Sequence, residues 1–141
     1  MTRVNVGIDV RELSNQLLFA EYREIIRIPN SILSGRAKVF ESTIPPQFKL
    51  GQGHVMFFYN KLQFLRRRHQ QLLQMCRHRG INVTDTSSSF EKLYSLQKFR
   101  ELWGDYTPTL RDRQILLARF AERGHVLLPI PEEDATLYLA H

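Results

Sequence analysis

Apolar residues recur every three or four positions in three segments of the chain, and this is the spacing of one face of an α-helix. In the first segment, residues 13–28, two such stripes run along the same helix, and we expect Pro29 to end it. The stripes are formed by Leu18, Tyr22 and Ile25 and by Leu17, Ala20 and Ile28. Asp9 followed by Glu12 is typical of a capping box, and Ser14 is an alternative helix start.

The second segment predicts one long helix that ends at Gly80, and the third predicts a helix over residues 110–123 that ends at Gly124. Their apolar positions are Val55, Phe58, Leu62, Leu65, Leu72 and Cys76 in the second and Ile115, Leu116, Ala118 and Phe120 in the third. Between the helices, loops are indicated at Pro45-Pro46, at Gly51-Gln52-Gly53, at residues 87–89 and at Pro108. Short apolar runs at residues 4–8 and 126–130 give only weak evidence of strands.

These patterns predict an all-α fold, a compact domain of three main helices with the N-terminal peptide packed against the first two. At 141 residues the chain can bury one core but not two, so we expect residues 1–141 to form a single domain. No apolar run reaches membrane-spanning length and the first residues lack the apolar stretch of a signal peptide. We therefore expect a cytoplasmic protein. Cys76 is the single cysteine, which excludes an internal disulfide.

The net charge of +6 changes the picture because the positive charge is concentrated. Residues 42–84 contain no acidic side chain. The basic residues there are Lys49, Lys61, Arg66, Arg67, Arg68, Arg77 and Arg79. Such a stretch suits phosphates, since each neutralised phosphate releases counterions. A solvated cationic surface explains the same composition equally well.

Candidate chemistry lies near the N-terminus. Removal of methionine before the small Thr2 would leave an α-amino group with a pKa of roughly 7.7 to 8.0, partly neutral and nucleophilic at physiological pH. A primary amine that attacks the anomeric carbon of a nucleoside displaces the base and forms an imine, after which β-elimination can expel the 3′ phosphate. Most chain ends take no part in catalysis, so the residues alone do not select Thr2.

Glu24 is the natural partner of such an amine, because it shares a helical stripe with Leu17, Ala20 and Ile28 where an apolar residue is expected. A carboxylate there could stabilise a developing oxocarbenium charge, orient the amine and take a proton from the sugar. The alternative interpretation is an i,i+3 salt bridge between Glu24 and Arg27 at the helix surface.

Three pairs of basic residues each share a helical face, which makes a DNA-binding groove plausible. The pairs are Arg23 with Arg27, Lys61 with Arg68, and Arg119 with Arg123, and Arg3 joins the first pair if the N-terminal peptide docks there. The five histidines show no metal-ligand spacing, so we expect no metal site. The aromatic run at residues 56–59 is interpreted as core rather than as a base-stacking surface.

Several separated blocks, in one order, resemble the pyrimidine-dimer DNA glycosylases of the phage endonuclease V type. They are Met1-Thr-Arg-Val-Asn5, Ala20-Glu-Tyr-Arg-Glu24 with Arg27, Gly53-His-Val-Met-Phe-Phe-Tyr59 continuing through Arg66, Arg79-Gly80 with Asp85-Thr86, and Gly104-Asp-Tyr106 with Pro108. The resemblance covers residues 1–124 and leaves residues 125–141 as a divergent tail. A run of blocks in order is far more specific than any single motif.

The resemblance implies a domain of three helices with the N-terminal peptide between the first two, and a DNA glycosylase with abasic-site lyase activity that needs no cofactor. It implies a monomer acting on double-stranded DNA, which it kinks while flipping the base opposite the lesion. By the same resemblance, the amine of Thr2 forms the imine and Glu24 is essential for the chemistry. It also implies that Arg3, Arg23, Arg27, Arg119 and Arg123 contact the DNA and that Gln16 and Tyr22 line the same site. Lys61 and Arg68 are predicted to bind DNA from their shared helical face alone. With this family, the expected cytoplasm is that of a bacterial or phage-infected cell.

Two departures from the family concern the substrate. Leu17 stands where the family has a histidine, and the tail lacks the aromatic cluster that helps those enzymes recognise the dimer, with Tyr138 its one aromatic residue. The substrate is therefore either a pyrimidine dimer or another damaged or modified base. Two alternatives stay open, a DNA-binding module that lost turnover and a protein whose basic face binds an acidic partner.

Overall fold

The computed structural model describes residues 2–130, and within them the fold is all-α, as the sequence predicts. The helices are α1 (Asn15–Ile25), α2 (Arg27–Leu33), α3 (His54–Phe57), α4 (Leu62–His78), α5 (Ser88–Ser95) and α6 (Leu110–Glu122). Short 3-10 helices occur at η1 (Val10–Glu12), η2 (Glu41–Thr43) and η3 (Gln97–Leu102). Among these residues no strand forms, and none of the helices is both long and apolar enough to cross a membrane.

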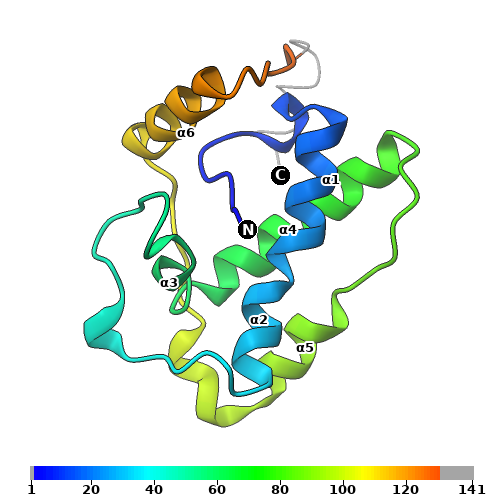
Figure 1. The fold of residues 1–141 in the computed structure, drawn as a ribbon. Coiled ribbons are helices and arrows are strands. Elements are labelled where there is room, and N and C mark those ends of the chain that lie inside the picture. Colours follow the sequence, from blue (N-terminus) through cyan, green and yellow to red (C-terminus); the bar gives the residue numbers. More distant parts are fainter. Residues whose placement is uncertain (1, 131–141) are drawn as a thin grey trace.

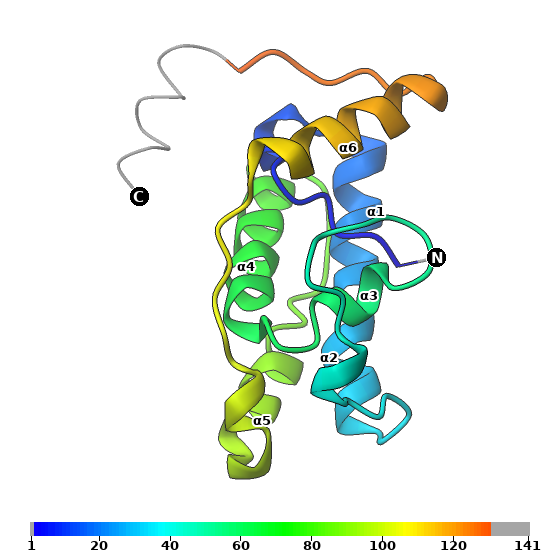
Figure 2. The same ribbon diagram turned by 90° about the vertical axis from the view of Figure 1, so that its left-hand side faces the viewer.

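The helices surround the N-terminal peptide. α1 and α2 follow one another nearly in line, and α4 crosses and packs on α1 (Figure 1). α6 lies at the end of the molecule where α1 begins, while α5 packs on α2 at the opposite end (Figure 2). The N-terminal peptide runs through the middle of this arrangement, from its free end between α1 and α3 to the turn of η1 (Figures 1 and 2).

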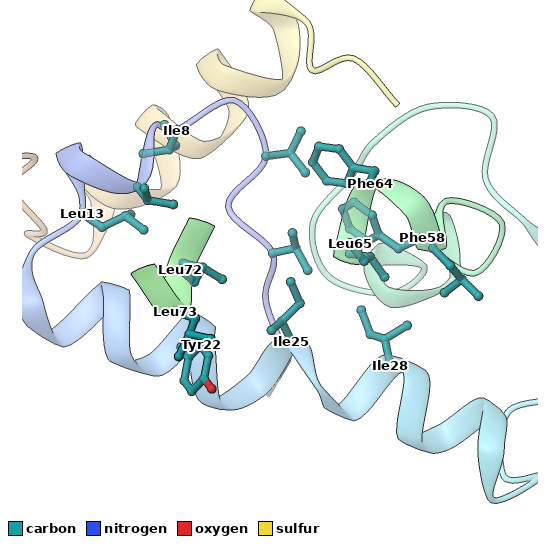
Figure 3. Packing of buried hydrophobic residues seen from close by; sticks show 14 of the residues in the cluster. Ile8, Leu13, Tyr22, Ile25, Ile28, Phe58, Phe64, Leu65, Leu72 and Leu73 are labelled. Atoms are coloured by element: carbon teal, nitrogen blue, oxygen red, sulfur yellow. The ribbon is translucent and has the colours of Figure 1, made fainter. Parts of the chain in front are cut away.

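The N-terminal peptide forms the centre of the core. Val4, Val6, Ile8 and Val10 alternate along it and are each at most 1% exposed. Figure 3 shows Ile8 in the same apolar layer as the residues that α1, α2 and α4 contribute. Fully burying one such side chain stabilises the fold by about 1.5–3 kcal/mol, so this segment contributes to stability far beyond its length.

The start of α1 shows that both capping signals in the sequence are real. Asp9 and Glu12 form a capping box, but it caps the short η1. The side chain of Ser14 accepts from the amide of Leu17 at 3.2 Å and caps α1. The chain therefore begins two helices within six residues, a shorter spacing than hydrophobic periodicity can resolve.

The prediction that Pro29 ends the first helix was wrong. α1 ends at Ile25, and α2 begins at Arg27 and continues to Leu33. Pro29 is the third residue of α2, where its missing N–H costs no intrahelical hydrogen bond and its fixed φ suits a first turn. The proline therefore accounts for a break between two helices in line with each other rather than for the end of the helical region.

The single long second helix was also wrong, because residues 58–61 separate α3 from α4. The amide of Gly104 donates to the carbonyl oxygen of Asn60, and the carbonyl of Gly104 accepts from the amide of Gln63, both at 3.2 Å. A Cβ atom at Gly104 would lie 2.6 Å from the Asn60 carbonyl oxygen, so only glycine permits this approach. The break between α3 and α4 is thus supported by a contact between residues distant in sequence. The spacing of nearby apolar residues could not predict it.

A third difference is α5, since the serines at residues 87–89 were interpreted as a loop. Ser87 is the N-cap residue of α5, which buries Phe90 and Leu93 against the rest of the core. Eight residues with two buried positions are too few for a periodic signal. α6, by contrast, matches the third predicted helix to within one residue.

The buried side chain of His69 connects residues 84–86, which precede α5, to the helical core. The Nε2 atom of His69 lies 2.8 Å from Oγ1 of Thr86, and its ring stacks on Tyr22 and contacts Phe90. The Tyr22 hydroxyl donates to the carbonyl of Thr84 and accepts from the amide of Thr86. His69 is fully buried, and this burial lowers its pKa to about 4.

We predict that His69 makes stability fall with acidity. Its imidazole is neutral in the fold, whereas the unfolded chain protonates it below a pKa of about 6.5, so its contribution is complete above that pH and is lost towards about pH 4. The free energy of unfolding should drop by about 2–3 kcal/mol across this range, measured by urea denaturation. In His69→Gln the drop should be smaller, while replacement of the exposed His78 by glutamine should not change it. Equal drops in all three proteins would contradict the assignment.

Candidate active site

A cavity of about 250 Å³ lies where the N-terminal peptide, α1 and the end of α6 meet. It is lined by Arg3, Asn5, Leu17, Ala20, Glu21, Glu24 and Arg123. The four residues from α1 occupy positions i, i+3, i+4 and i+7, so they present a single helical face to the cavity. The carboxylate predicted to be catalytic therefore faces a cavity, on the stripe where an apolar residue was expected.

Positive charge gathers around this cavity. Burial lowers the pKa of Arg3, and the neighbouring charges of Arg119 and Arg123 lower it further, while Glu24 opposes them. The charges of Arg119 and Arg123 thus act on Arg3, and the nearby carboxylates are those of Glu24 and Glu122. An arrangement with an excess of cations in a half-buried position favours the binding of an anion such as a phosphate group.

Glu24 both faces the cavity and lies near Arg27, so the two interpretations that the sequence left open do not exclude each other. Its side chain is 15% exposed and lines the cavity, and one carboxylate oxygen lies 4.0 Å from a guanidinium nitrogen of Arg27. The Arg27 side chain is itself 51% exposed, so solvent screens this i,i+3 pair and it contributes little to stability. The carboxylate therefore keeps a position from which it can interact with a ligand in the cavity.

Thr2 lines a smaller neighbouring cavity of about 130 Å³. The other residues that line it are Arg3, Leu50, Gly51, His54 and Val55. Arg3 contributes to both cavities, so the chain places Thr2 beside the cavity of Glu24 without making it part of that cavity's wall. The structure thus brings Thr2, Arg3, Glu24 and Arg123 into one region.

A buried ion pair includes Glu21, one of the residues that line the larger cavity. Glu21 accepts from the Arg68 guanidinium at 2.7 and 3.0 Å, and Arg68 donates in addition to the carbonyl of Ile8 at 2.6 Å. The Nδ2 atom of Asn5 donates to the same Glu21 carboxylate at 2.7 Å. α1, α4 and the N-terminal peptide are therefore joined through one carboxylate that is fully buried.

Asn5 leaves one acceptor for a ligand. An ionised carboxylate can only accept, so the amide nitrogen of Asn5 must face Glu21 and its carbonyl oxygen must point elsewhere. That oxygen is buried and has no hydrogen-bond partner among residues 2–130. A buried acceptor in the wall of a cavity is suited to an N–H or O–H group of the molecule that enters it.

The remaining residues predicted to bind DNA lie at the margin of this region. Arg23 is exposed on α1, with its guanidinium 5.4 Å from the centre of the Phe19 ring. Arg119 on α6 is half-buried and lies 3.6 Å from Glu122, and Gln16 is exposed in the first turn of α1. None of these three side chains lines the cavity, but α1 and α6 are the helices that border it.

Three side chains that were predicted to contact DNA have partners within the protein. Arg68 is 6% exposed and holds the buried Glu21, so it supports the fold. Tyr22 is 4% exposed and points to residues 84–86 rather than into the cavity. The ammonium of Lys61 donates to the carbonyl of Phe57 and to Asn60, both at 2.9 Å, and lies 3.8 Å from the centre of the Phe57 ring. Helical spacing identified which residues share a face but not whether that face is buried.

Sequence analysis missed Asn5, Glu21 and His54 as residues of the site. Asn5 lies between the buried Val4 and Val6, and a polar residue inside a short apolar run was an available signal. Glu21 resembles an ordinary surface residue in sequence, and His54 was considered only as a metal ligand. Among residues 2–130, no three histidine, cysteine or acidic side chains lie close enough to hold a metal ion.

This all-α domain places a carboxylate, several arginines and its own N-terminal segment around one cavity. These are the features of an enzyme that acts on a phosphate-bearing substrate. The sequence model of the pyrimidine dimer DNA glycosylase family matches residues 1–89, which is more than half of the chain. The chain therefore belongs to the pyrimidine dimer DNA glycosylase family, which makes it a DNA glycosylase with DNA as its substrate. The match includes the N-terminal peptide, α1, α3 and α4, whereas α6 with Arg119 and Arg123 lies outside it.

We predict that the ion pair of Glu21 and Arg68 is essential for stability. Arg68→Met would leave the Glu21 carboxylate buried without its cation and should lower the free energy of unfolding by about 3–5 kcal/mol, measured by urea denaturation. Replacing both Glu21 and Arg68 by methionine should recover a large part of that loss. Arg67→Met is the matched control, because its pair with Asp105 is exposed and should contribute at most about 1 kcal/mol. Equal effects at positions 67 and 68 would contradict the assignment.

Proposed function

We propose that the protein removes a damaged or modified base from double-stranded DNA and then cleaves the strand, with the amine of Thr2 as nucleophile. The observation that carries the proposal is the position of Thr2 beside the cavity of Glu24 in a member of this glycosylase family. The amine requires that Met1 be removed. A pyrimidine dimer is the first candidate substrate.

The reaction balances without an added cofactor. The amine nitrogen bonds to C1′ of the deoxyribose, and the C1′–N bond to the base breaks with its electron pair, so the base leaves and takes up a proton. Opening of the sugar ring at C1′–O4′ then gives a protonated imine. This imine acidifies C2′, and removal of a C2′ proton drives the electrons to expel the 3′ phosphate oxygen. Water hydrolyses the imine and regenerates the amine.

Glu24 and the surrounding arginines have separate tasks in this scheme. The Glu24 carboxylate stabilises positive charge at C1′ as the base leaves and accepts the C2′ proton. Arg3, Arg27 and Arg123 bind the phosphates on either side of the reacting sugar, and Arg23 and Arg119 extend the same basic surface along α1 and α6. The phosphate contacts hold the kinked duplex around the reacting sugar while the base opposite the lesion is flipped out.

A second candidate function is a DNA-binding module of the same fold without turnover. Leu17 favours it, because this residue presents an apolar side chain to the cavity where a polar group could have assisted the chemistry. The same apolar wall also supports a third possibility, a glycosylase that selects a modified base other than the dimer. Residues 131–141, including Tyr138, lie outside the described residues.

Borohydride reduction distinguishes these candidates. Protein with Met1 removed should form a covalent complex when borohydride is added during reaction with duplexes that are ultraviolet-irradiated, abasic or base-modified. Acetylation of the terminal amine is the control and should abolish the covalent complex. Binding of abasic DNA without any trapped complex would show that the protein is a module without turnover. Comparison of the duplexes would identify the preferred lesion.

We predict that Glu24→Gln separates binding from chemistry. The substitution keeps the size of the side chain but removes its charge and basicity, so single-turnover cleavage should fall by at least about 100-fold. Affinity for lesion-bearing DNA should change by no more than about 3-fold, because the phosphates are bound by arginines. Glu91→Gln, on the exposed surface of α5, is the control and should retain full activity. Parallel losses of affinity and cleavage would instead assign Glu24 a structural role.

A further inference from the structure

His54 holds the N-terminal peptide through a hydrogen bond to its backbone. The imidazole begins α3, is 4% exposed, and lies against Phe48 and Phe58, with each ring centre 5.4 Å away. Its Nδ1 atom is 2.8 Å from the carbonyl oxygen of Lys49, and its Nε2 atom accepts from the amide of Val4 at 2.9 Å. A carbonyl can only accept, so Nδ1 carries the proton and Nε2 is the acceptor. Both ring nitrogens of the neutral imidazole are therefore used, in one tautomer.

The residue that follows Val4 is held from the other side. Asn5 donates to Glu21 of α1, so consecutive residues of the N-terminal peptide are bound by α3 and by α1. From the Val4 amide only two residues remain to the proposed nucleophile, which limits its distance from that point to about 7 Å. Terminal residues usually fray, and here two hydrogen bonds restrict that motion close to the free end.

Resting on the proposed function, we propose that His54 is a positioning residue, whose neutral imidazole fixes the Val4 backbone and thereby holds the amine of Thr2 in reach of the sugar bound beside Glu24. His54 and Thr2 line the same cavity, and Arg3 connects that cavity to the one of Glu24. His54 makes no bond to the substrate in this scheme. Its effect is on the geometry of attack, where an error of 1 Å can reduce the rate about 100-fold.

The surroundings of His54 keep the imidazole neutral. Burial lowers its pKa most strongly, the positive charge of Arg3 lowers it further, and the Lys49 carbonyl and the Glu21 carboxylate oppose these effects. A protonated ring would turn an N–H group towards the Val4 amide and lose the hydrogen bond. Acidic pH would protonate the Thr2 amine as well, so a pH profile cannot distinguish the two groups and the test relies on substitutions.

Glutamine and asparagine separate the two hydrogen bonds of His54. The amide of His54→Gln reaches the position of Nε2, so its oxygen can accept from Val4. The amide of His54→Asn ends near the position of Nδ1, so it can donate to Lys49 but cannot reach Val4. Both variants keep a neutral polar group at the site, and they differ in the bond that the proposal requires.

The decisive measurement is the rate of borohydride trapping on saturating abasic duplex, together with the affinity for that duplex. His54→Asn should lower the trapping rate by at least about 10-fold, and His54→Gln by no more than about 3-fold, with affinity unchanged in both. Exchange of the Val4 amide, followed by NMR, should be fast in the asparagine variant and slow in the glutamine variant. Equal trapping rates in the two variants, or losses that follow affinity, would overturn the proposal.

Two further results keep the test interpretable. If both variants unfold, Val4→Pro removes the same hydrogen bond from the other partner, and full trapping by that variant would overturn the proposal. If the unaltered protein forms no trapped complex, the proposed function fails, whereas the exchange of the Val4 amide still reports whether His54 holds the segment. His78→Gln is the matched control and should behave as the unaltered protein in every measurement.

Discussion

One buried carboxylate joins the parts of the molecule from which the site is built. Glu21 of α1 binds the guanidinium of Arg68 on α4 and the amide of Asn5 in the N-terminal peptide. Removing a charge from water is costly, so a fully buried carboxylate is stable only with these partners in place. The position of the N-terminal peptide between the two helices is therefore coupled to the folding of both. Glu24 lies one turn further along α1, so the contacts of Glu21 also fix the position of Glu24 relative to that peptide.

The distribution of charge follows from the same principle. The acid-free stretch at residues 42–84 suggested a phosphate-binding surface, yet much of its charge is matched by partners from elsewhere in the chain. Arg67 pairs with Asp105, Arg68 with Glu21, and Arg79 donates to the carbonyls of Arg11 and Leu13. The cations around the cavity come instead from the N-terminal peptide and from α6. A stretch of sequence that is rich in positive charge is therefore not necessarily a positively charged surface of the folded protein.

Sequence periodicity predicted those helices whose formation depends on residues close together in the sequence. α6 and most of α1 have a continuous apolar stripe, and both helices were predicted from it. The features that it could not predict depend on contacts distant in sequence, as in the break that Gly104 makes possible before α4. For the site, the spacing around Glu24 placed its carboxylate on an apolar stripe, and in the structure this side chain lines a cavity. An arginine on a helix is equally common at the surface and in a buried pair, so Arg68 was assigned to the wrong one.

A nucleophile at a chain end sets two opposing requirements. The amine must be accessible to a sugar, but a terminus that is free to move rarely occupies the geometry of attack. In this fold the conflict is resolved by distance along the chain, since residues 4–8 are buried in the core while Thr2 and Arg3 line cavities. The scaffold can therefore hold the proposed nucleophile without enclosing it. The apolar face of Leu17 in the same cavity changes the groups available to the substrate and leaves this support intact, so lesion choice and chemistry can vary independently.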